Sequence, residues 1–356
     1  MNRLAALALL AACRAAPTTA APAPAPATAP VPTPAPATPT ATATATPTPP
    51  APTSILVAPT GLGFDDLVFA PRAHRVLLPA ASTGEIAAVD PDTFAVTRLR
   101  AFPASTRAYQ SGHHDDGVTS AAEGDARFYA TDRDALEVVA LDPTTGRKLA
   151  SAKLASEPDY VRFVPAPARA EVWVTEPDRA QIEVFTPELA RVTTFAVPGG
   201  PESLVVDASH GVAYANLWHG KSVAIDLASH AVRETYASGC QKSRGLALDP
   251  AWALLFVGCN EGKVQVVDLA TQKVVASAPA ADGIDIIDYD RARHRVFAPG
   301  ARSATMSVFS VAQNGSLTAL PAVPVARGSH CVVLDDKGRA WVCDPDGGKA
   351  LICTVP

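Results

Sequence analysis

The sequence predicts an all-β protein, a β-propeller of seven blades with four antiparallel strands in each blade. The first observation is the stretch Ser243–Ala278, in which four short runs rich in apolar and β-branched residues alternate with turn sequences such as Asn260-Glu261-Gly262. The second observation is that this stretch recurs along the chain. The third is that the last copy lacks its fourth strand, while an unpaired strand is found near the start.

The recurrence is clearest at the end of the third strand of each unit, where an apolar residue is followed by Asp or by a small polar residue. Seven such pairs follow one another at intervals of 40–52 residues, close to the period of a propeller blade. A long sandwich or a β-helix is the alternative. The second residues of the pairs are Asp90, Asp142, Thr186, Asp226, Asp268, Ser310 and Cys353.

The seven units begin near residues 66, 116, 157, 199, 243, 283 and 328. A longer polar segment, Ala101–Asp115, separates the first two units and contains Tyr109, His113 and His114. Propellers carry binding groups on such rim loops, although a solvated loop is the alternative. The seventh unit ends after three strands. We therefore expect the strand Ser54–Ala58 to complete this last blade and to close the ring without a covalent link.

The composition supports a folded domain and limits its function. Of the 356 residues 48% are hydrophobic but only 6% are aromatic, so we expect a core of Val, Leu, Ile and Ala. The formal net charge of −5 does not favour a nucleic-acid partner. The chain has no G-x-S-x-G motif and no glycine-rich phosphate loop. We expect a monomer.

The first 13 residues have the features of an export signal, with Arg3 followed by the short apolar run Leu4–Ala12. This run is too short to span a bilayer. The sequence Leu10-Ala11-Ala12-Cys13 resembles the bacterial lipobox, which implies lipidation of Cys13. We therefore expect an extracytoplasmic protein in the periplasm or cell envelope, held to a membrane by a lipid anchor. Plain secretion is the alternative.

Residues 14–53 consist almost entirely of Ala, Pro and Thr. Such a segment cannot bury enough apolar surface to fold, and its prolines favour an extended chain. The sequence thus predicts a signal peptide over 1–13, a disordered linker over 14–53 and the propeller over 54–356.

Five cysteines follow Cys13, as expected for an oxidising compartment. Cys240 and Cys259 fall at the same rim of the fifth unit, and we predict a disulfide between them. Cys331 and Cys343 face each other across neighbouring antiparallel strands, which predicts a second disulfide. Cys353 is left over and competes for Cys343, and buried thiols are the alternative for all of these. The absence of CxxC and CxxCH disfavours thiol redox chemistry of that type and covalent haem.

The repeated pattern resembles the YVTN-repeat (YncE-like) seven-bladed propellers over roughly Ser54–Pro356. Gly199-Gly200-Pro201-Glu202 and Val264–Val275 are its clearest instances, and the repeated Gly-His and Trp-Asp dipeptides of WD-repeat proteins are missing. The resemblance implies a secreted or surface propeller that acts as a binding or interaction scaffold for a protein or a small molecule. It is specific for the fold and carries little information about activity.

Alignment of the units places one polar residue at the start of each first strand, and these residues should converge on one mouth of the central channel. Carboxylates gathered there repel one another, and Arg or a metal ion can compensate that repulsion. The alternative is a water-filled channel mouth. The residues are Asp66, Asp116, Asp159, Glu202, Arg244, Asp285 and His330.

A divalent cation is the cofactor that this ring could hold. Oxygen ligands suit Ca²⁺, and nearby histidines suit Zn²⁺. We take the metal set to be Asp159, Glu202, Asp285 and His330. Such a site keeps open a metal-dependent hydrolase or lactonase resembling the gluconolactonase-like propellers, with His330 as general base. The ligand motif of that family is not matched position by position, so a non-catalytic binding scaffold is the preferred interpretation.

Overall fold

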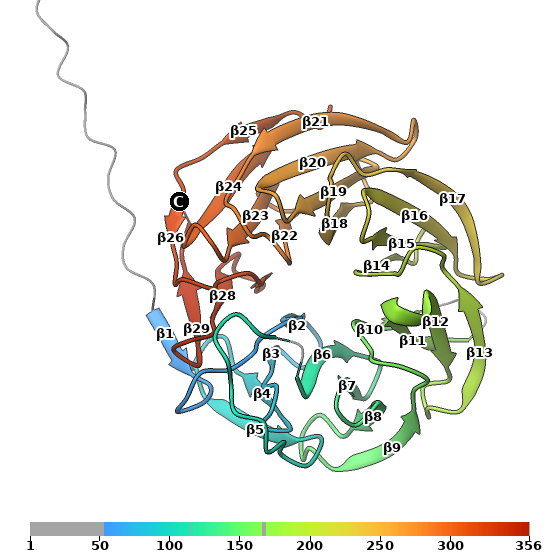
Figure 1. The fold of residues 1–356 in the computed structure, drawn as a ribbon, viewed down its shortest axis with the longest axis vertical. Coiled ribbons are helices and arrows are strands. Elements are labelled where there is room, and N and C mark those ends of the chain that lie inside the picture. The colour runs from blue at the N-terminus through green and yellow to red at the C-terminus, as the bar shows by residue number, and fades with distance from the viewer. Residues whose placement is uncertain (1–52, 115, 166–168, 356) are drawn as a thin grey trace, which may run out of the picture. The chain divides into compact units, whose positions relative to one another are not determined.

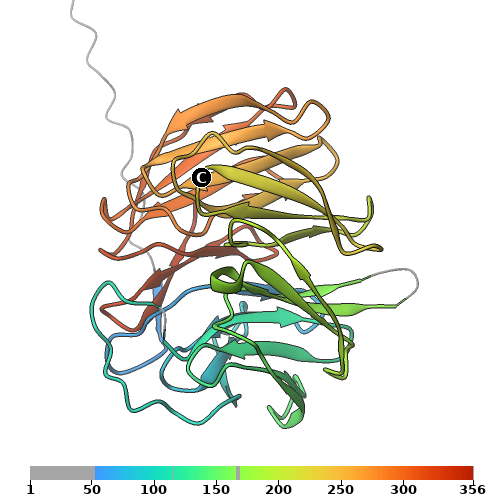
Figure 2. The ribbon, with the colours of Figure 1, turned by 45° about the vertical axis from the view of Figure 1, so that its right-hand side comes forward.

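The computed structural model describes residues 53–114, 116–165 and 169–355. It confirms the prediction of seven antiparallel blades arranged in a ring (Figure 1). Within blades 1 to 6 the strands pair in chain order, and the first strand lies nearest the ring axis. Neighbouring sheets face one another around the ring (Figure 2), and the described residues contain one short 3₁₀ turn, η1 (Pro177–Arg179).

The first four blades follow directly along the chain. Blade 1 consists of β2 (Val68–Ala70), β3 (Arg75–Pro79), β4 (Glu85–Val89) and β5 (Val96–Arg100). Blade 2 consists of β6 (Val118–Glu123), β7 (Phe128–Asp132), β8 (Glu137–Leu141) and β9 (Lys148–Lys153). Blade 3 consists of β10 (Val161–Val164), β11 (Glu171–Glu176), β12 (Gln181–Phe185) and β13 (Arg191–Ala196). Blade 4 consists of β14 (Val205–Asp207), β15 (Val212–Leu217), β16 (Lys221–Asp226) and β17 (Ala231–Ala237).

The last three blades complete the ring. Blade 5 consists of β18 (Ser243–Asp249), β19 (Leu254–Cys259), β20 (Lys263–Asp268) and β21 (Lys273–Pro279). Blade 6 consists of β22 (Asp288–Asp290), β23 (Arg295–Gly300), β24 (Thr305–Val311) and an outer strand split into β25 (Leu317–Ala319) and β26 (Val323–Pro324). Blade 7 consists of β27 (Val332–Leu334), β28 (Ala340–Asp344), β29 (Lys349–Cys353) and β1 (Thr53–Leu56).

The recurring Asp at the end of the third strand has a structural role in the turn that follows it. The side chain of Asp90 accepts hydrogen bonds from the backbone N–H groups of Asp92 and Thr93. Asp142 and Asp226 each bind the N–H groups two and three residues further on. These bonds replace backbone partners in the tight turn to the fourth strand, which explains why this position repeats.

The N-terminal strand closes the ring, as predicted. β1 pairs antiparallel with β29, and Ser54 lies opposite Leu351. The Ile55 and Val57 side chains are buried in the core, whereas Leu56 is 54% exposed. The backbone N–H of Val57 then donates to the Gly348 carbonyl at 2.8 Å. Closure therefore combines a strand ladder with burial of alternate side chains.

A disulfide joins Cys240, in the loop after β17, to Cys259 at the end of β19, as predicted for blade 5. The core between the blades is built mainly of Val, Leu, Ile and Ala, with Trp173 and Trp341 among its largest buried side chains. No helix in the described ranges is long and apolar enough to cross a membrane. Cys13 and the predicted linker lie outside the described residues.

Ring closure can be tested at two neighbouring positions of β1. Ile55→Ala should lower the free energy of unfolding by about 2–4 kcal/mol, because it removes a buried side chain from the seventh blade. Leu56→Ala is the matched control and should change it by less than about 0.5 kcal/mol, since Leu56 is exposed. Chemical denaturation measures the free energy of unfolding of both variants. Equal losses in the two variants would contradict the placement of β1 in the seventh blade.

Candidate functional site

A cavity of about 480 Å³ lies at the end of the channel where the first strands of the blades begin. Five of the seven residues predicted for this mouth line it. Four of them lie two or three residues before an innermost strand, and the fifth lies in β18. We call this cavity the channel mouth. The five residues are Asp159, Glu202, Arg244, Asp285 and His330.

Asp66 does not line the channel mouth, contrary to the prediction, and its neighbour Asp65 takes this place. Adjacent residues of an extended chain point to opposite sides, so an error of one position reverses the direction of the side chain. Asp66 instead accepts hydrogen bonds from the Ser120 hydroxyl at 2.6 Å and from the Arg162 guanidinium at 2.6 and 3.0 Å. Asp66 is thus the acid partner of Arg162, which lies in β10.

Asp116 also lies away from the channel mouth. Its carboxylate pairs with Arg107 at 2.6 Å, within the long segment between blades 1 and 2. Arg133, which directly follows β7, lines the mouth on this side of the ring instead. Blade 2 thus contributes a cation where the alignment of the first strands predicted a carboxylate.

Two guanidinium groups hold the acids of the channel mouth together. One Arg133 nitrogen lies 2.5 Å from Asp159 and 3.3 Å from Asp65. Arg244 pairs with Glu202 and lies 3.9 Å from Asp285. These side chains are largely buried, so removing one partner would leave an uncompensated charge away from water.

The arginines do not fully offset the burial of these acids. Burial raises the pKa of the Asp65 and Asp159 carboxyls well above their usual range, even though Arg133 acts against this. Burial and the charge of Asp159 likewise raise the pKa of Glu202. Burial also disfavours ionised Asp285, but His114 and His330 outweigh it and lower the pKa of that carboxyl. The channel mouth therefore holds negative charge at an energetic cost.

The segment between β5 and β6 reaches across to blade 7 (Figure 1). The Tyr109 hydroxyl donates to Asp346 at 2.9 Å. The His114 ring stacks obliquely on the His330 ring, with centroids 4.8 Å apart, and its Nε2 lies 3.8 Å from Asp285. Tyr109, His113 and His114 all line the channel mouth, so this insertion forms part of its wall.

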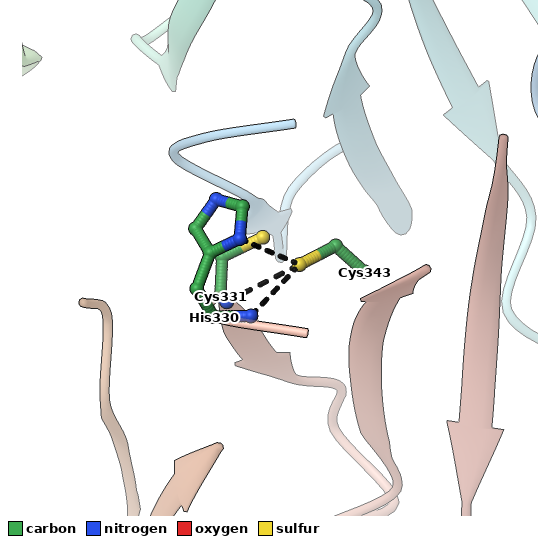
Figure 3. A group of neighbouring side chains, drawn as sticks. All are labelled: His330, Cys331 and Cys343. Carbon is green, nitrogen blue, oxygen red and sulfur yellow. Dashed lines mark hydrogen bonds between the residues drawn. The ribbon is translucent and has the colours of Figure 1, made fainter. Parts of the chain in front are cut away.

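Cys331 and Cys343 are free thiols in the structure, so the predicted second disulfide is not formed, and Cys353 is free as well. The two strands do bring Cys331 and Cys343 opposite each other. The Cys343 sulfur, however, accepts hydrogen bonds from the backbone N–H groups of His330 and Cys331, at 3.3 and 3.2 Å. It also lies 3.8 Å from His330 Nδ1 (Figure 3).

The surroundings of the Cys343 sulfur favour its ionised form. Burial alone would raise the pKa of the Cys343 thiol, but the Cys331 hydrogen bond and the His330 charge lower it well below its usual range. Burial would lower the pKa of His330, and contact with Cys343 raises it well above its usual value. The two groups thus favour a thiolate beside an imidazolium.

The predicted four-residue metal set is not assembled. Asp159 and Glu202 are each engaged by an arginine, and neither belongs to a group of potential ligands close enough to share one ion within the described ranges. Asp285 and His330 do form such a group, with His114 as the third member and ligand atoms within 4.8 Å of one another.

The sequence analysis missed four residues that shape the channel mouth: Asp65, Arg133, Trp218 and Arg302. Asp65 directly precedes Asp66, the residue that the sequence predicted for the channel mouth. Arg133 and Arg302 come from loops after the second strands, which the alignment of the first strands did not sample. Trp218 follows β15 and precedes His219 and Gly220. Its position in a turn was the only feature of the sequence that could have indicated a role at the channel mouth.

Comparison with known proteins supports the fold and nothing finer. No family model matches the chain, and no curated protein matches it. A chain of Kuenenia stuttgartiensis hydrazine synthase is similar, with a TM-score of 0.68 and 15% identity, and the match covers 85% of this chain and 97% of that one. A chain of the mitotic checkpoint complex has a TM-score of 0.71 at 12% identity, covering 88% and 98%.

The Cps50 (Swd1) β-propeller domain of Myceliophteria thermophila has a TM-score of 0.69 at 12% identity, and the match covers 86% of this chain and all of that domain. Likeness at such low identity defines a class, the seven-bladed β-propellers, and transfers no activity.

The cost of charge in the channel mouth predicts an unusual pH dependence. Because the pKa of Glu202 is raised in the folded protein, the protonated carboxyl stabilises the fold. This contribution to the free energy of unfolding is fully present below about pH 4.3, the ordinary glutamate pKa. It is lost as the pH rises through the raised pKa. Glu202→Gln keeps an oxygen for Arg244 but carries no charge. Its melting temperature should match that of the wild type at pH 4 and exceed it by a few degrees at pH 8.

Glu261→Gln is the control with the opposite sign, because backbone N–H groups lower the pKa of Glu261. The stability from Glu261 is present at high pH and is lost on acidification, so this variant should be less stable than the wild type at pH 8. If Glu202→Gln is less stable than the wild type, and more so at pH 8 than at pH 4, the raised pKa of Glu202 is refuted.

Proposed function

We propose that this protein is a non-catalytic binding propeller whose channel mouth takes up a basic side chain of a peptide or protein partner. The observation that carries the proposal is a surplus of carboxylates over guanidinium groups. Seven carboxylates and three guanidinium groups from the described residues line the channel mouth. Asp65 and Asp159 are buried, Glu202 and Asp285 are half-buried, and the other three carboxylates are exposed. Burial, and after it the repulsion by neighbouring acids, raises the pKa of Asp159 and Glu202, and a cation that enters would offset both effects.

The hydrogen-bonding groups of the channel mouth support a ligand with this chemistry. Within the described part of the chain, Asp159 Oδ2 is buried and has no hydrogen-bond partner, so it can accept from a ligand N–H. The Trp218 indole N–H is likewise buried without a partner, so it can donate to a ligand carbonyl. An arginine or lysine in a peptide offers both a cation and backbone carbonyls.

The shape of the channel mouth also suits such a group. Its volume lies in the range of small-ligand pockets, and aromatic side chains of Tyr109 and Trp218 contribute to its wall. Aromatic faces attract guanidinium and ammonium groups. One structural neighbour is a chain of the mitotic checkpoint complex, which agrees with an interaction role.

We further propose that the propeller belongs with the YVTN-repeat proteins and works outside the cytoplasm, tethered through a lipid on Cys13. The sequence from Arg3 to Cys13 and the Ala-, Pro- and Thr-rich segment after it support this proposal. A propeller on a long stalk could meet a partner at the surface of the envelope.

A second candidate function is metal-dependent hydrolysis of an ester or lactone. It is favoured by the group His114, Asp285 and His330, whose ligand atoms lie within 4.8 Å of one another. A zinc ion there would activate water beside the acids of the channel mouth. Lactonase activity that requires added metal and is abolished by Asp285→Asn would establish this candidate.

Binding can be tested with two probes that differ only in charge. Nα-acetylarginine amide should bind the channel mouth, and the isosteric, uncharged Nα-acetylcitrulline amide should bind at least about tenfold more weakly, because one charge-assisted hydrogen bond contributes about 1.5–3 kcal/mol. Isothermal titration calorimetry measures both affinities. Equal binding of the two probes, or no binding of either, would refute the proposal.

The double variant Glu202→Gln with Asp285→Asn should weaken binding of the arginine probe about tenfold or more. Asp282→Asn is the matched control and should bind as the wild type does. Asp282 is a nearby acid that is half-exposed and paired with Arg302, and it does not line the channel mouth.

Lipid anchoring can be tested separately. Cys13→Ser should move the protein from the membrane fraction to the soluble fraction, or should block its maturation, because the modified thiol would be missing. Fractionation of cells that express the wild type and the variant gives the answer. Unchanged membrane partitioning of the variant would exclude the anchor.

A further inference from the structure

Three potential metal ligands lie together beside the channel mouth, at the start of blade 7 (Figure 3). Cys331 directly precedes β27, and Cys343 lies opposite it in β28, with its N–H donating to the Cys331 carbonyl at 3.2 Å. Both thiols are fully buried, and His330 is 7% exposed. One histidine nitrogen and the two sulfur atoms all lie within 4.8 Å of one another.

We propose that His330, Cys331 and Cys343 form a zinc site with two thiolate ligands and one imidazole ligand, whose fourth position is open to the channel mouth. This site differs from the oxygen-rich set expected from the sequence, with which it shares only His330. It does not depend on the proposed binding of a basic side chain.

The distances between the ligand atoms suit one small ion. Zinc bonds of about 2.0–2.1 Å to nitrogen and 2.3 Å to sulfur place tetrahedral N and S ligands about 3.5 Å apart, and two S ligands about 3.8 Å apart. His330 Nδ1 lies 3.8 Å from the Cys343 sulfur. The upper limit of 4.8 Å for the group leaves an adjustment of about 1.3 Å at most, within reach of small side-chain rotations.

Two contacts of the ligand residues already suit a bound metal. His330 Nε2 lies 2.9 Å from the Phe64 carbonyl, so a proton on Nε2 would leave Nδ1 free to face the sulfur atoms. A backbone carbonyl on the second ring nitrogen is the usual partner of a histidine that binds metal. The two backbone N–H groups that donate to the Cys343 sulfur would support a metal-bound thiolate.

Occupation of the site requires a defined release of protons. Without metal, Nδ1 lies 2.7 Å from the Gly328 carbonyl, which is the contact of a protonated nitrogen. Zinc would form one bond to Nδ1 and one to each sulfur, and the protons that these atoms carried would pass to solvent. No electron is transferred, and no oxidant or reductant is needed.

The donor set also excludes other ions. Ca²⁺ and Mg²⁺ require oxygen ligands, whereas two thiolates and an imidazole select a thiophilic transition metal. An ion could reach the site through the channel mouth, because His330 lines it together with Gly328 and Pro345. The open fourth position would then face the same cavity, as in zinc sites that keep a water or a ligand.

The test uses the full chain, freed of metal with a chelator and kept reduced with a phosphine. Zinc affinity is measured by competition with a chromophoric chelator, and Co²⁺ serves as a spectroscopic probe of thiolate ligation. We expect one equivalent of zinc with high affinity, and sulfur-to-cobalt charge-transfer bands in the wild type. Because loss of a supporting group already weakens metal binding by about 10- to 100-fold, Cys331→Ser and Cys343→Ser should weaken it by more than about 100-fold.

Two controls make the result specific. Cys353→Ser should bind zinc as the wild type does, because Cys353 is another buried free thiol of blade 7, paired with Ala340 at the far end of β28. Asp285→Asn should also retain zinc and the charge-transfer bands, which separates this site from the group of His114, Asp285 and His330. Full zinc binding by Cys343→Ser, cobalt spectra without sulfur bands, or no uptake by the reduced wild type would overturn the proposal.

Discussion

The convergence of seven inner strands on one axis is the constraint on which the rest of the site depends. Each blade brings the start of its first strand to the same end of the channel, around a cavity of about 480 Å³. Acids from blades that are far apart in sequence, such as Asp65 and Asp159, therefore share one arginine. Their arrangement depends on closure of the ring, and closure depends on the pairing of β1 with β29.

Much of the fold could be predicted because its signals are local and repeated. Every blade needs a turn after its third strand, and Asp90, Asp142 and Asp226 supply the same hydrogen bonds at each turn. This local requirement leaves a period in the sequence that can be counted. The incomplete seventh unit and the strand near residue 54 then predicted how the ring closes.

The site was less predictable because it depends on side-chain direction and on loops that do not repeat. A difference of one residue separates Asp65, which lines the channel mouth, from Asp66, which binds Arg162 on the other side. Arg133 replaces the acid expected from blade 2, and nothing in the repeat indicates this. The two cysteines of blade 7 were placed correctly opposite each other, but the contact of Cys343 with His330 involves a third residue that strand pairing alone does not predict.

The account rests on the claim that buried acids of the channel mouth are incompletely compensated. Titration of side-chain carboxyl carbons by NMR measures this most directly, in the wild type and in Glu202→Gln. We predict a glutamate resonance that titrates clearly above the value of about 4.3 for an exposed glutamate and is absent from the variant. If the resonance that disappears in Glu202→Gln titrates at or below that value in the wild type, the burial of Glu202 is fully compensated and the account is wrong.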